Sequence, residues 1–259
     1  PLARVRAPAV ALARGGFVLT RGDTDILDFG AKLFAGQANV ARVFLRPDGS
    51  SWRPGDRLVQ AGLARTLQAI AAGGSDAFYT GEIPRQVEAA SRAGGGLLTA
   101  ADFAAYTVTE SEPLSCRYRG ATILSAPPPS SGGTTLCEIL TILDGYDLRA
   151  AGFNSARTVH LMVEAMRRAF ADRNILLGDP DFGPNPVAQL LSPAYAEKLR
   201  ATIRPDRATP SADIRPAPEN LPQEKPETTH ISVMDKAGNA VSLTYTINGY
   251  FGAGVMAGE

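Results

Sequence analysis

The residues best placed to do chemistry are polar side chains that alternate with apolar ones near position 228. Thr228 begins one alternating segment, and Thr246 lies in a second segment that starts at Ala240. Alternation predicts β-strands, in which every second side chain lies on the same face. The polar face then carries three threonines, two serines, a histidine and an asparagine: Thr228, His230, Ser232, Ser242, Thr244, Thr246 and Asn248.

A threonine hydroxyl is a poor nucleophile unless a base removes its proton. A threonine at a chain terminus solves this problem, because its own α-amine is the base. That amine has an ordinary pKa of roughly 7.7 to 8.0, so a useful fraction of it is neutral near physiological pH. For Thr228 this chemistry requires cleavage of the peptide bond that follows Glu227.

A β-hairpin is expected to position these side chains, since a turn-forming stretch at 235–239 separates the two segments. A turn centred in that stretch places Ser232 opposite Ser242 and Thr228 opposite Thr246. The other face of the hairpin is apolar and is expected to pack in a core. A sheet with one buried face and one face in water explains the same pattern without catalysis, so the pattern alone leaves both interpretations open.

Residues 56–202 are expected to be mainly helical. Apolar residues at spacings of three and four run from Val59 to Ile70 and stop at a glycine pair. A strand is expected at 118–125, before a loop rich in proline, serine and glycine. Ser155 is placed to cap a longer helix with one apolar side that is expected to pack in a core. The residues on that side are Val159, Met162, Val163, Met166 and Phe170.

Residues 204–227 differ in composition from the rest of the chain. Prolines punctuate a polar stretch with little periodicity: Pro205, Pro210, Pro216, Pro218, Pro222 and Pro226. This composition predicts an extended, mobile tail. The tail ends directly before the Thr-Thr-His sequence, which is where a cut would free Thr228.

The composition excludes several classes of function. Lys plus Arg total 26 and Asp plus Glu total 26, so no dominant charge attracts nucleic acid or an anionic membrane surface. No apolar run reaches the roughly 18 residues of a membrane span. Cys116 and Cys137 lack the spacing of a zinc or redox site and could pair or remain two packed thiols. Only two histidines occur, so a His-rich metal centre is not expected, and no metal or organic cofactor is implied.

Several motifs follow one another in a distinctive order along the chain. After Glu227 they are Thr228–Val241, Thr244-x-Thr246-x-Asn248 and Phe251-Gly252-x-Gly254. Before it they are Pro8–Phe17, Pro127–Gly133, Ala171–Arg173 and Gly178–Phe182. Together, and almost end to end, these motifs resemble the γ-glutamyltranspeptidase family of N-terminal-nucleophile hydrolases.

The resemblance implies a precursor that cuts itself between Glu227 and Thr228. The Thr228 hydroxyl attacks the Glu227 carbonyl, and water hydrolyses the resulting ester. The freed Thr228 then attacks the γ-amide of glutathione or another γ-glutamyl donor, and water or an amino-acid or peptide acceptor takes the γ-glutamyl group. By the same resemblance, Thr246 supports the nucleophile and Asn248 holds the amino-acid end of the donor.

The fold that the resemblance implies is α/β (α+β), the four-layer αββα sandwich of N-terminal-nucleophile hydrolases, of which this chain is a helix-rich part. Residues 1–227 would be the C-terminal portion of the large subunit, and residues 228–259 the start of the small subunit. The family's donor-binding arginine lies before Pro1, and its oxyanion-hole glycines lie after Glu259. We therefore expect this piece to be inactive alone and to need the remaining segments of both subunits. Bacterial relatives imply a periplasmic or secreted location.

A serine–histidine–aspartate triad is an alternative that would use Ser130 or Ser131, with His160 or His230 as the base. The G-x-S-x-G spacing of a nucleophile elbow is absent around these serines. His160 lies four residues before Glu164, so a solvated helix pair explains it. His230 is expected to make only local hydrogen bonds.

Three further interpretations involve a different ligand or no catalysis. The Ser-Gly-Gly loop could cradle a phosphate, but the lysine of a phosphate-binding P-loop is missing, so a structural loop is the better interpretation. A binding module on the same fold that never cleaves itself remains open. A cephalosporin (glutaryl) acylase-like N-terminal-nucleophile amidase also remains open, because the residues that would select its donor lie outside this chain.

Overall fold

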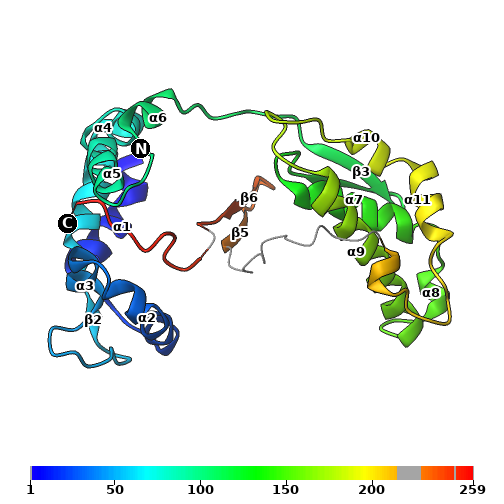
Figure 1. The fold of residues 1–259 in the computed structure, drawn as a ribbon, viewed down its shortest axis with the longest axis horizontal. Coiled ribbons are helices and arrows are strands. Elements are labelled where there is room, and N and C mark those ends of the chain that lie inside the picture. The colour runs from blue at the N-terminus through cyan, green and yellow to red at the C-terminus, as the bar shows by residue number, and fades with distance from the viewer. Residues whose placement is uncertain (1, 215–228, 248, 259) are drawn as a thin grey trace. The chain divides into compact units, whose positions relative to one another are not determined.

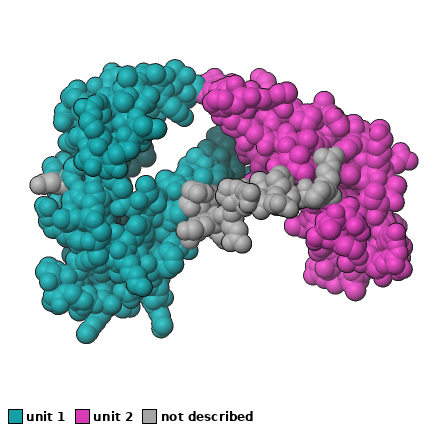
Figure 2. Space-filling model, viewed as in Figure 1, with its two compact units in different colours: residues 1–108, 224–259 teal, residues 109–223 magenta. Residues whose placement is uncertain are grey.

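The structure, a computed structural model, describes residues 2–214, 229–247 and 249–258. The chain divides into two compact units, unit 1 with residues 1–108 and 224–259 and unit 2 with residues 109–223 (Figure 2). Helices dominate the described residues, and each sheet among them is a pair of antiparallel strands (Figure 1). No helix in this described part is long and apolar enough to cross a membrane.

Unit 1 is built mainly from helices that follow one another along the chain. A short ladder between β1 (Phe17–Val18) and β2 (Arg57–Leu58) joins its early segments. Helix α2 begins with a capping box, in which Thr20 and Asp23 satisfy each other's backbone amides. The described helices of the unit are α1 (Leu2–Gly15), α2 (Arg21–Phe34), α3 (Ala38–Phe44), α4 (Ala61–Tyr79), α5 (Glu82–Ala93) and α6 (Ala100–Ala105).

The core of unit 1 is an aromatic and aliphatic cluster around Phe34. Phe34 stacks on Phe44 with 5.1 Å between ring centroids, and the ring of Phe251 meets Phe34 edge-on at 4.6 Å. A residue far along the chain therefore completes a core that α2, α3 and β2 begin. The buried members of the cluster are Leu19, Leu27, Phe34, Val40 and Leu58.

The glycine pair in α4 is a kink within the helix. The apolar pattern predicts a helix that stops at Gly73 and Gly74, but helical structure resumes after the pair and continues to Tyr79. Gly74 has φ 64° and ψ −145°, a conformation that glycine adopts without the steric cost of a side chain. The chain thus breaks its helix at the predicted place and then continues as helix in a new direction.

Unit 2 joins a hairpin to a group of helices. The single strand expected at 118–125 is wrong, because the chain turns at Arg119 and Gly120, which have positive φ values of 49° and 86°. Two consecutive positive φ values give a turn that matches the twist of the strands it joins. The described elements are β3 (Leu114–Tyr118), β4 (Ala121–Ser125), α7 (Ser131–Leu143), α8 (Leu148–Ala151), α9 (Ala156–Leu176), α10 (Val187–Leu190), α11 (Pro193–Arg200) and the 3₁₀ turn η1 (Ser211–Asp213).

Helix α9 buries a different side from the one that its apolar pattern predicts. Ser155 caps the helix as expected, because its hydroxyl accepts a hydrogen bond from a backbone amide of the first turn. The predicted apolar side, from Val159 to Phe170, is 41–46% exposed, so the expectation that it packs in a core is wrong for the described residues. Leu161 and Ala165 pack instead with residues of α7, on a side that also carries charged groups.

Two of those charged groups form a buried pair. Glu164, which is 1% exposed, accepts a 2.7 Å hydrogen bond from Arg168. It also accepts hydrogen bonds from the backbone amide and the hydroxyl of Thr209, at 3.0 and 2.6 Å. Arg168 donates to the Thr202 carbonyl as well, so both charges have the partners that burial requires. Burial disfavours the carboxylate, but the hydrogen bonds from Thr209 and Arg168 outweigh it and lower the pKa of Glu164 to about 2.

The same contacts hold the described part of the predicted mobile tail. Of residues 204–227, the structure describes 204–214. Arg167 donates to the Thr209 carbonyl at 2.7 Å and to the Ser211 hydroxyl at 2.9 Å. The described part of the tail is therefore bound to α9, and the remainder lies outside the described residues.

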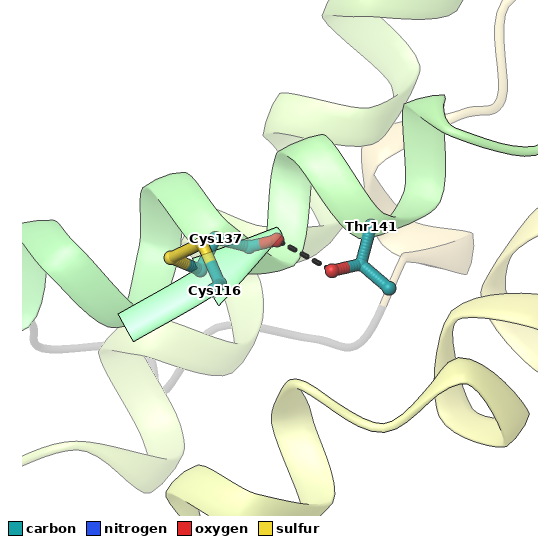
Figure 3. Close-up of a disulfide and its surroundings, with 3 residues drawn as sticks. All are labelled: Cys116, Cys137 and Thr141. Atoms are coloured by element: carbon teal, nitrogen blue, oxygen red, sulfur yellow. Dashed lines mark hydrogen bonds between the residues drawn. A yellow bond between two sulfur atoms is a disulfide. The ribbon is translucent and has the colours of Figure 1, made fainter. Parts of the chain in front are cut away.

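A disulfide joins the two cysteines of the chain (Figure 3). Cys116 lies on β3 and Cys137 on α7, so the bond ties the hairpin of unit 2 to the helix that follows it. Thr141, one turn further along α7, donates to the Cys137 carbonyl at 2.7 Å. Of the two possibilities that the sequence leaves open, the structure has the paired one.

Glu164→Gln in the full-length protein is expected to cost about 3 kcal/mol of stability at pH 7, because Arg168 would keep a buried charge without its carboxylate. The lowered pKa of Glu164 means that its contribution in the wild type is complete above its ordinary value of 4.5 and is lost as the pH falls towards 2. The stability of the variant should therefore fall less steeply below pH 4.5. Thermal melting across this pH range measures both effects.

The matched control is Glu82→Gln. Glu82 pairs with Arg85 at 2.9 Å, but both side chains are at least 60% exposed. Exposed ion pairs contribute roughly 0 to 1 kcal/mol, so this variant should melt close to the wild type. Two outcomes would contradict the assigned role of Glu164. One is an equal loss of stability in the two variants, and the other is a Glu164→Gln protein whose stability falls with pH as steeply as that of the wild type.

Candidate active site

The candidate site is carried by a hairpin in unit 1. Strand β5 (Thr229–Met234) pairs with β6 (Ala240–Tyr245) in antiparallel register, with Ser232 opposite Ser242. The predicted register is confirmed over every pair that the structure describes in this ladder. Its extension to position 228 lies outside the described residues.

Asp235 holds the turn that sets this register. Its carboxylate accepts hydrogen bonds from the amides of Ala237 and Asn239, both at 2.9 Å, and from the Asn239 side chain at 2.8 Å. Gly238 supplies the positive φ of 85° that the turn needs. Hydrogen bonding to Asn239 lowers the pKa of Asp235, so the carboxylate is ionised at neutral pH and stays a strong acceptor.

His230 is the centre of hydrogen bonding on the polar face of the hairpin. Its Nδ1 lies 2.7 Å from the hydroxyl of Thr244, the residue directly opposite it. Its Nε2 lies 3.0 Å from the Ser232 hydroxyl and 3.1 Å from that of Ser242. These are the local hydrogen bonds expected for His230. They link the two strands on the face that also carries Thr246.

The apolar face of the hairpin is exposed as well. The core expected against this face is therefore not formed by the described residues. Its side chains are between 45% and 64% exposed: Ile231, Val233, Val241, Leu243, Tyr245 and Ile247.

The structure places one of the residues to which the sequence assigns a catalytic, binding or cleavage role. Thr246 is described, exposed, and lies directly after β6. Glu227, Thr228 and Asn248 lie outside the described residues. The pairing of Thr228 with Thr246 and the roles of all four residues therefore stay predictions.

One feature of the site was not expected from the sequence: residues 249–258 lie on α2 and α3. Phe251 enters the core of unit 1, and Gln37 and Asn39 hydrogen-bond to the backbone of Met256. The Phe-Gly-x-Gly motif at 251–254 carries the signal that could have found this docking. An aromatic residue followed by two closely spaced glycines indicates a tight segment packed closely on its neighbours, and Gly252 and Gly254 do have positive φ in the structure.

The triad alternative is not supported by the hydrogen bonds of its residues. The Ser131 hydroxyl accepts a 2.9 Å hydrogen bond from an arginine of α9, and Nε2 of His160 lies 2.6 Å from the Arg204 carbonyl. A triad needs the serine and histidine to bond to each other. The expected solvated pair of His160 with Glu164 is wrong, because Glu164 is buried and pairs with Arg168.

The Ser-Gly-Gly loop before α7 is explained by packing. A side-chain carbon added at Gly133 would collide with the Ala126 carbonyl oxygen and would lie 2.9 Å from the Ser125 hydroxyl. Glycine is needed there because α7 begins close against the end of β4. This contact supports the structural interpretation of the loop over a phosphate cradle.

Comparison with known proteins gives sequence relatives over the whole chain. The family model described as gamma-glutamyltranspeptidase matches residues 1–259. The glutathione hydrolase proenzyme of Pseudomonas sp. (strain A14) is 50% identical over 97% of this chain and 43% of its own length. The acylase ACY 1 proenzyme of Pseudomonas sp. (strain SE83) is 42% identical over 99% of this chain and 45% of its own length. The chain thus spans less than half the length of these curated relatives.

A solved structure extends the likeness to the fold. The crystal structure of Helicobacter pylori gamma-glutamyltranspeptidase matches with a TM-score of 0.79 and 36% identity, over 87% of this chain and 64% of that chain. This match confirms the predicted fold class, that of the N-terminal-nucleophile hydrolases, to which the described residues contribute helices and paired strands. Because the family model covers the sequence from residue 1 to residue 259, the chain belongs to the γ-glutamyltranspeptidase family.

Proposed function

We propose that the whole protein is a glutathione hydrolase and γ-glutamyltransferase that matures by cutting itself before Thr228. Family membership and the 50% identity to a glutathione hydrolase proenzyme support this chemistry. The hairpin register supports the assignment of particular residues. In this register His230 lies opposite Thr244. Continued by two positions, the same register pairs position 228 with position 246.

Maturation follows from the chemistry of a threonine that comes after a peptide bond. The Thr228 hydroxyl adds to the Glu227 carbonyl carbon, the C–N bond breaks, and the acyl group moves from nitrogen to oxygen. Water then hydrolyses the ester, which releases the Glu227 carboxylate and leaves Thr228 with a free α-amine. One residue then provides both nucleophile and base.

In turnover, the α-amine of Thr228 takes the proton of its own hydroxyl as that hydroxyl attacks the carbonyl carbon of the donor's γ-amide. The C–N bond of the amide then breaks, and the amine part of the donor leaves with that proton. Water attacks the resulting γ-glutamyl ester in hydrolysis, and the amine of an amino acid or peptide attacks it in transfer. Thr246 supports the nucleophile through a hydrogen bond from across the hairpin. Strand alternation continued by two residues would put Asn248 on the same face, where we assign it to the amino-acid end of the donor. The reaction needs no metal or organic cofactor.

The cut would divide this chain into residues 1–227 and 228–259. Unit 1 includes residues from both sides of that bond, since it joins 1–108 with 224–259. The contact of Phe251 with Phe34 is one that would hold the two products together after cleavage. The remaining segments of the large and small subunits would complete the donor site.

We place the protein in the periplasm or outside the cell. Disulfides persist in oxidising compartments and are rare in the cytosol. The bond between Cys116 and Cys137 supports such a location.

A glutaryl-type acylase is the second candidate, favoured by the 42% identity to the acylase ACY 1 proenzyme. Both reactions use the same threonine and differ in the donor, because a glutaryl group lacks the α-amine of a γ-glutamyl group. Parallel assays of the full-length protein with γ-glutamyl and glutaryl anilides separate them. We expect the larger kcat/KM for the γ-glutamyl anilide, and a preference for the glutaryl anilide would replace the first candidate by the second.

Thr228→Ala in the full-length protein is expected to abolish self-cleavage, because the hydroxyl that attacks Glu227 is gone. Intact-mass measurement should show two fragments for the wild type, the second beginning at Thr228, and one uncut chain for the variant. Thr228→Ser keeps a hydroxyl, so it is the matched control and should still cleave. Efficient cleavage of Thr228→Ala at the same bond would rule out the autocatalytic mechanism. An uncut wild type would favour a binding module.

Thr246→Val removes a hydroxyl at nearly constant volume. We expect kcat for γ-glutamyl hydrolysis to fall about ten- to hundredfold, the effect of losing a hydrogen bond of roughly 1.5 to 3 kcal/mol to a charged group. Self-cleavage should slow as well. Thr246→Ser retains the hydroxyl and should keep most of both rates. Steady-state kinetics and a time course of cleavage measure them, and unchanged rates in Thr246→Val would show that position 246 does not support Thr228.

A further inference from the structure

The segment after the hairpin, residues 249–258, is bound to helices α2 and α3. We propose that this docking, which we name the α2–α3 clamp, sets the position of Thr246. Phe251, Gln37 and Asn39 are then positioning residues for the reaction, because they act through the hairpin and do not touch the donor. The inference rests on the proposed function, since it concerns the same site.

The first part of the clamp is aromatic. The ring of Phe251 meets Phe34 edge-on at 4.6 Å and lies 6.1 Å from Phe44, between ring centroids. A side-chain carbon added at Gly30 would lie 2.7 Å from Cε2 of Phe251 and would collide with the ring of Phe34. The missing side chain at Gly30 therefore makes room for Phe251 on α2, and a half-buried ring packed between two helices has little freedom to move.

The second part of the clamp is a set of side-chain amides on the backbone. Gln37 accepts a hydrogen bond from the Met256 amide at 3.0 Å and donates to the Met256 carbonyl at 3.3 Å. Asn39 donates to the Met256 carbonyl at 3.0 Å and to the Gly258 carbonyl at 2.7 Å. Asn39 is itself oriented, because its oxygen accepts from the Val40 amide at 3.0 Å. Two amides thus hold both backbone groups of one residue, as a neighbouring strand would.

Only a few residues separate the clamp from Thr246 along the chain. Gly252 donates to the Gly249 carbonyl at 3.1 Å, and Gly254 donates to the Phe251 carbonyl at 2.9 Å. A side-chain carbon added at Gly252 would lie 3.7 Å from Cδ1 of Ile247, so the turn folds back onto the residue that follows Thr246. Even fully extended, the five steps of chain from Thr246 to Phe251 would span at most about 18 Å. The C-terminal segment, red in Figure 1, runs from the hairpin to the group of helices that includes α3.

The proposed cut after Glu227 makes the link between β6 and the clamp important. Cleavage after Glu227 would remove the covalent link at the start of β5, which leaves the end of β6 as the covalently continuous side of the hairpin. Both strands of the hairpin are exposed along their whole described length, so the described residues do not hold the hairpin by packing on its faces. A misplacement of about 1 Å at a reacting group can lower a rate about a hundredfold. We therefore assign to the clamp the accurate positioning of the Thr246 side chain.

The test uses Asn39→Asp in the full-length protein. The exchange is nearly isosteric and keeps the oxygen that faces Val40, but an oxygen replaces the donor to Met256 and Gly258. We expect kcat for γ-glutamyl-p-nitroanilide to fall about tenfold per active site, with sites counted by an irreversible γ-glutamyl label. Phe251→Leu is the second variant. It keeps an apolar side chain but loses the ring contacts, so it should also lower kcat per active site.

A double-mutant cycle with Thr246→Val separates positioning from a merely structural role. If Asn39 acts through Thr246, Asn39→Asp should lower kcat about tenfold with Thr246 present and less than about twofold in the Thr246→Val background. A merely structural residue would lower the yield of folded protein and would act equally in both backgrounds. Equal factors in the two backgrounds would overturn the inference.

Gln68→Glu on α4 adds the same charge at an exposed position and should leave kcat unchanged. Unchanged kcat per active site in both Asn39→Asp and Phe251→Leu would also overturn the inference. A wild type that neither cleaves itself nor hydrolyses the γ-glutamyl anilide would instead overturn the proposed function. The two failures are therefore distinguishable.

Discussion

The antiparallel register of β5 and β6 is the constraint on which the candidate site depends. Side chains alternate along a strand with period two, so a slip of one residue would move every hydroxyl of the polar face to the apolar face. The Asp235 carboxylate and Gly238 hold the turn that sets the register, and His230 links the two strands by hydrogen bonds. These interactions are local in the chain, yet they decide which residue faces the proposed nucleophile.

Contacts between distant parts of the sequence then hold the end of the hairpin in place. Residues 249–258 return to helices formed early in the chain, where Phe251 completes the core around Phe34. The backbone can approach α2 closely because Gly254 has no side chain, and a carbon added there would lie 2.6 Å from Cγ of Leu33. A protein proposed to cut itself between these helices and the hairpin needs such contacts, since after the cut the peptide chain no longer connects them.

Unit 2 is organised by polar pairing as much as by apolar burial. Glu164 and Arg168 occupy the buried side of α9 and bind the Thr202–Thr209 segment, which is possible because each charge has a partner. The apolar side of the same helix is exposed, as is the apolar face of the β5–β6 hairpin. Both faces belong to a chain that spans less than half the length of its curated relatives.

The sequence by itself determined the hairpin, its turn and register, the cap at Ser155 and the break in α4 at Gly74. These features depend on alternation, capping and the conformational freedom of glycine, which act over a few residues. The sequence also determined the family, because its motifs extend along almost the whole chain. Only the tertiary structure decided that Cys116 bonds to Cys137, that Phe251 docks on α2, and that the apolar side of α9 is the exposed one. Hydrophobic burial has no direction, so a pattern identifies an apolar side of a helix but not the partner that covers it.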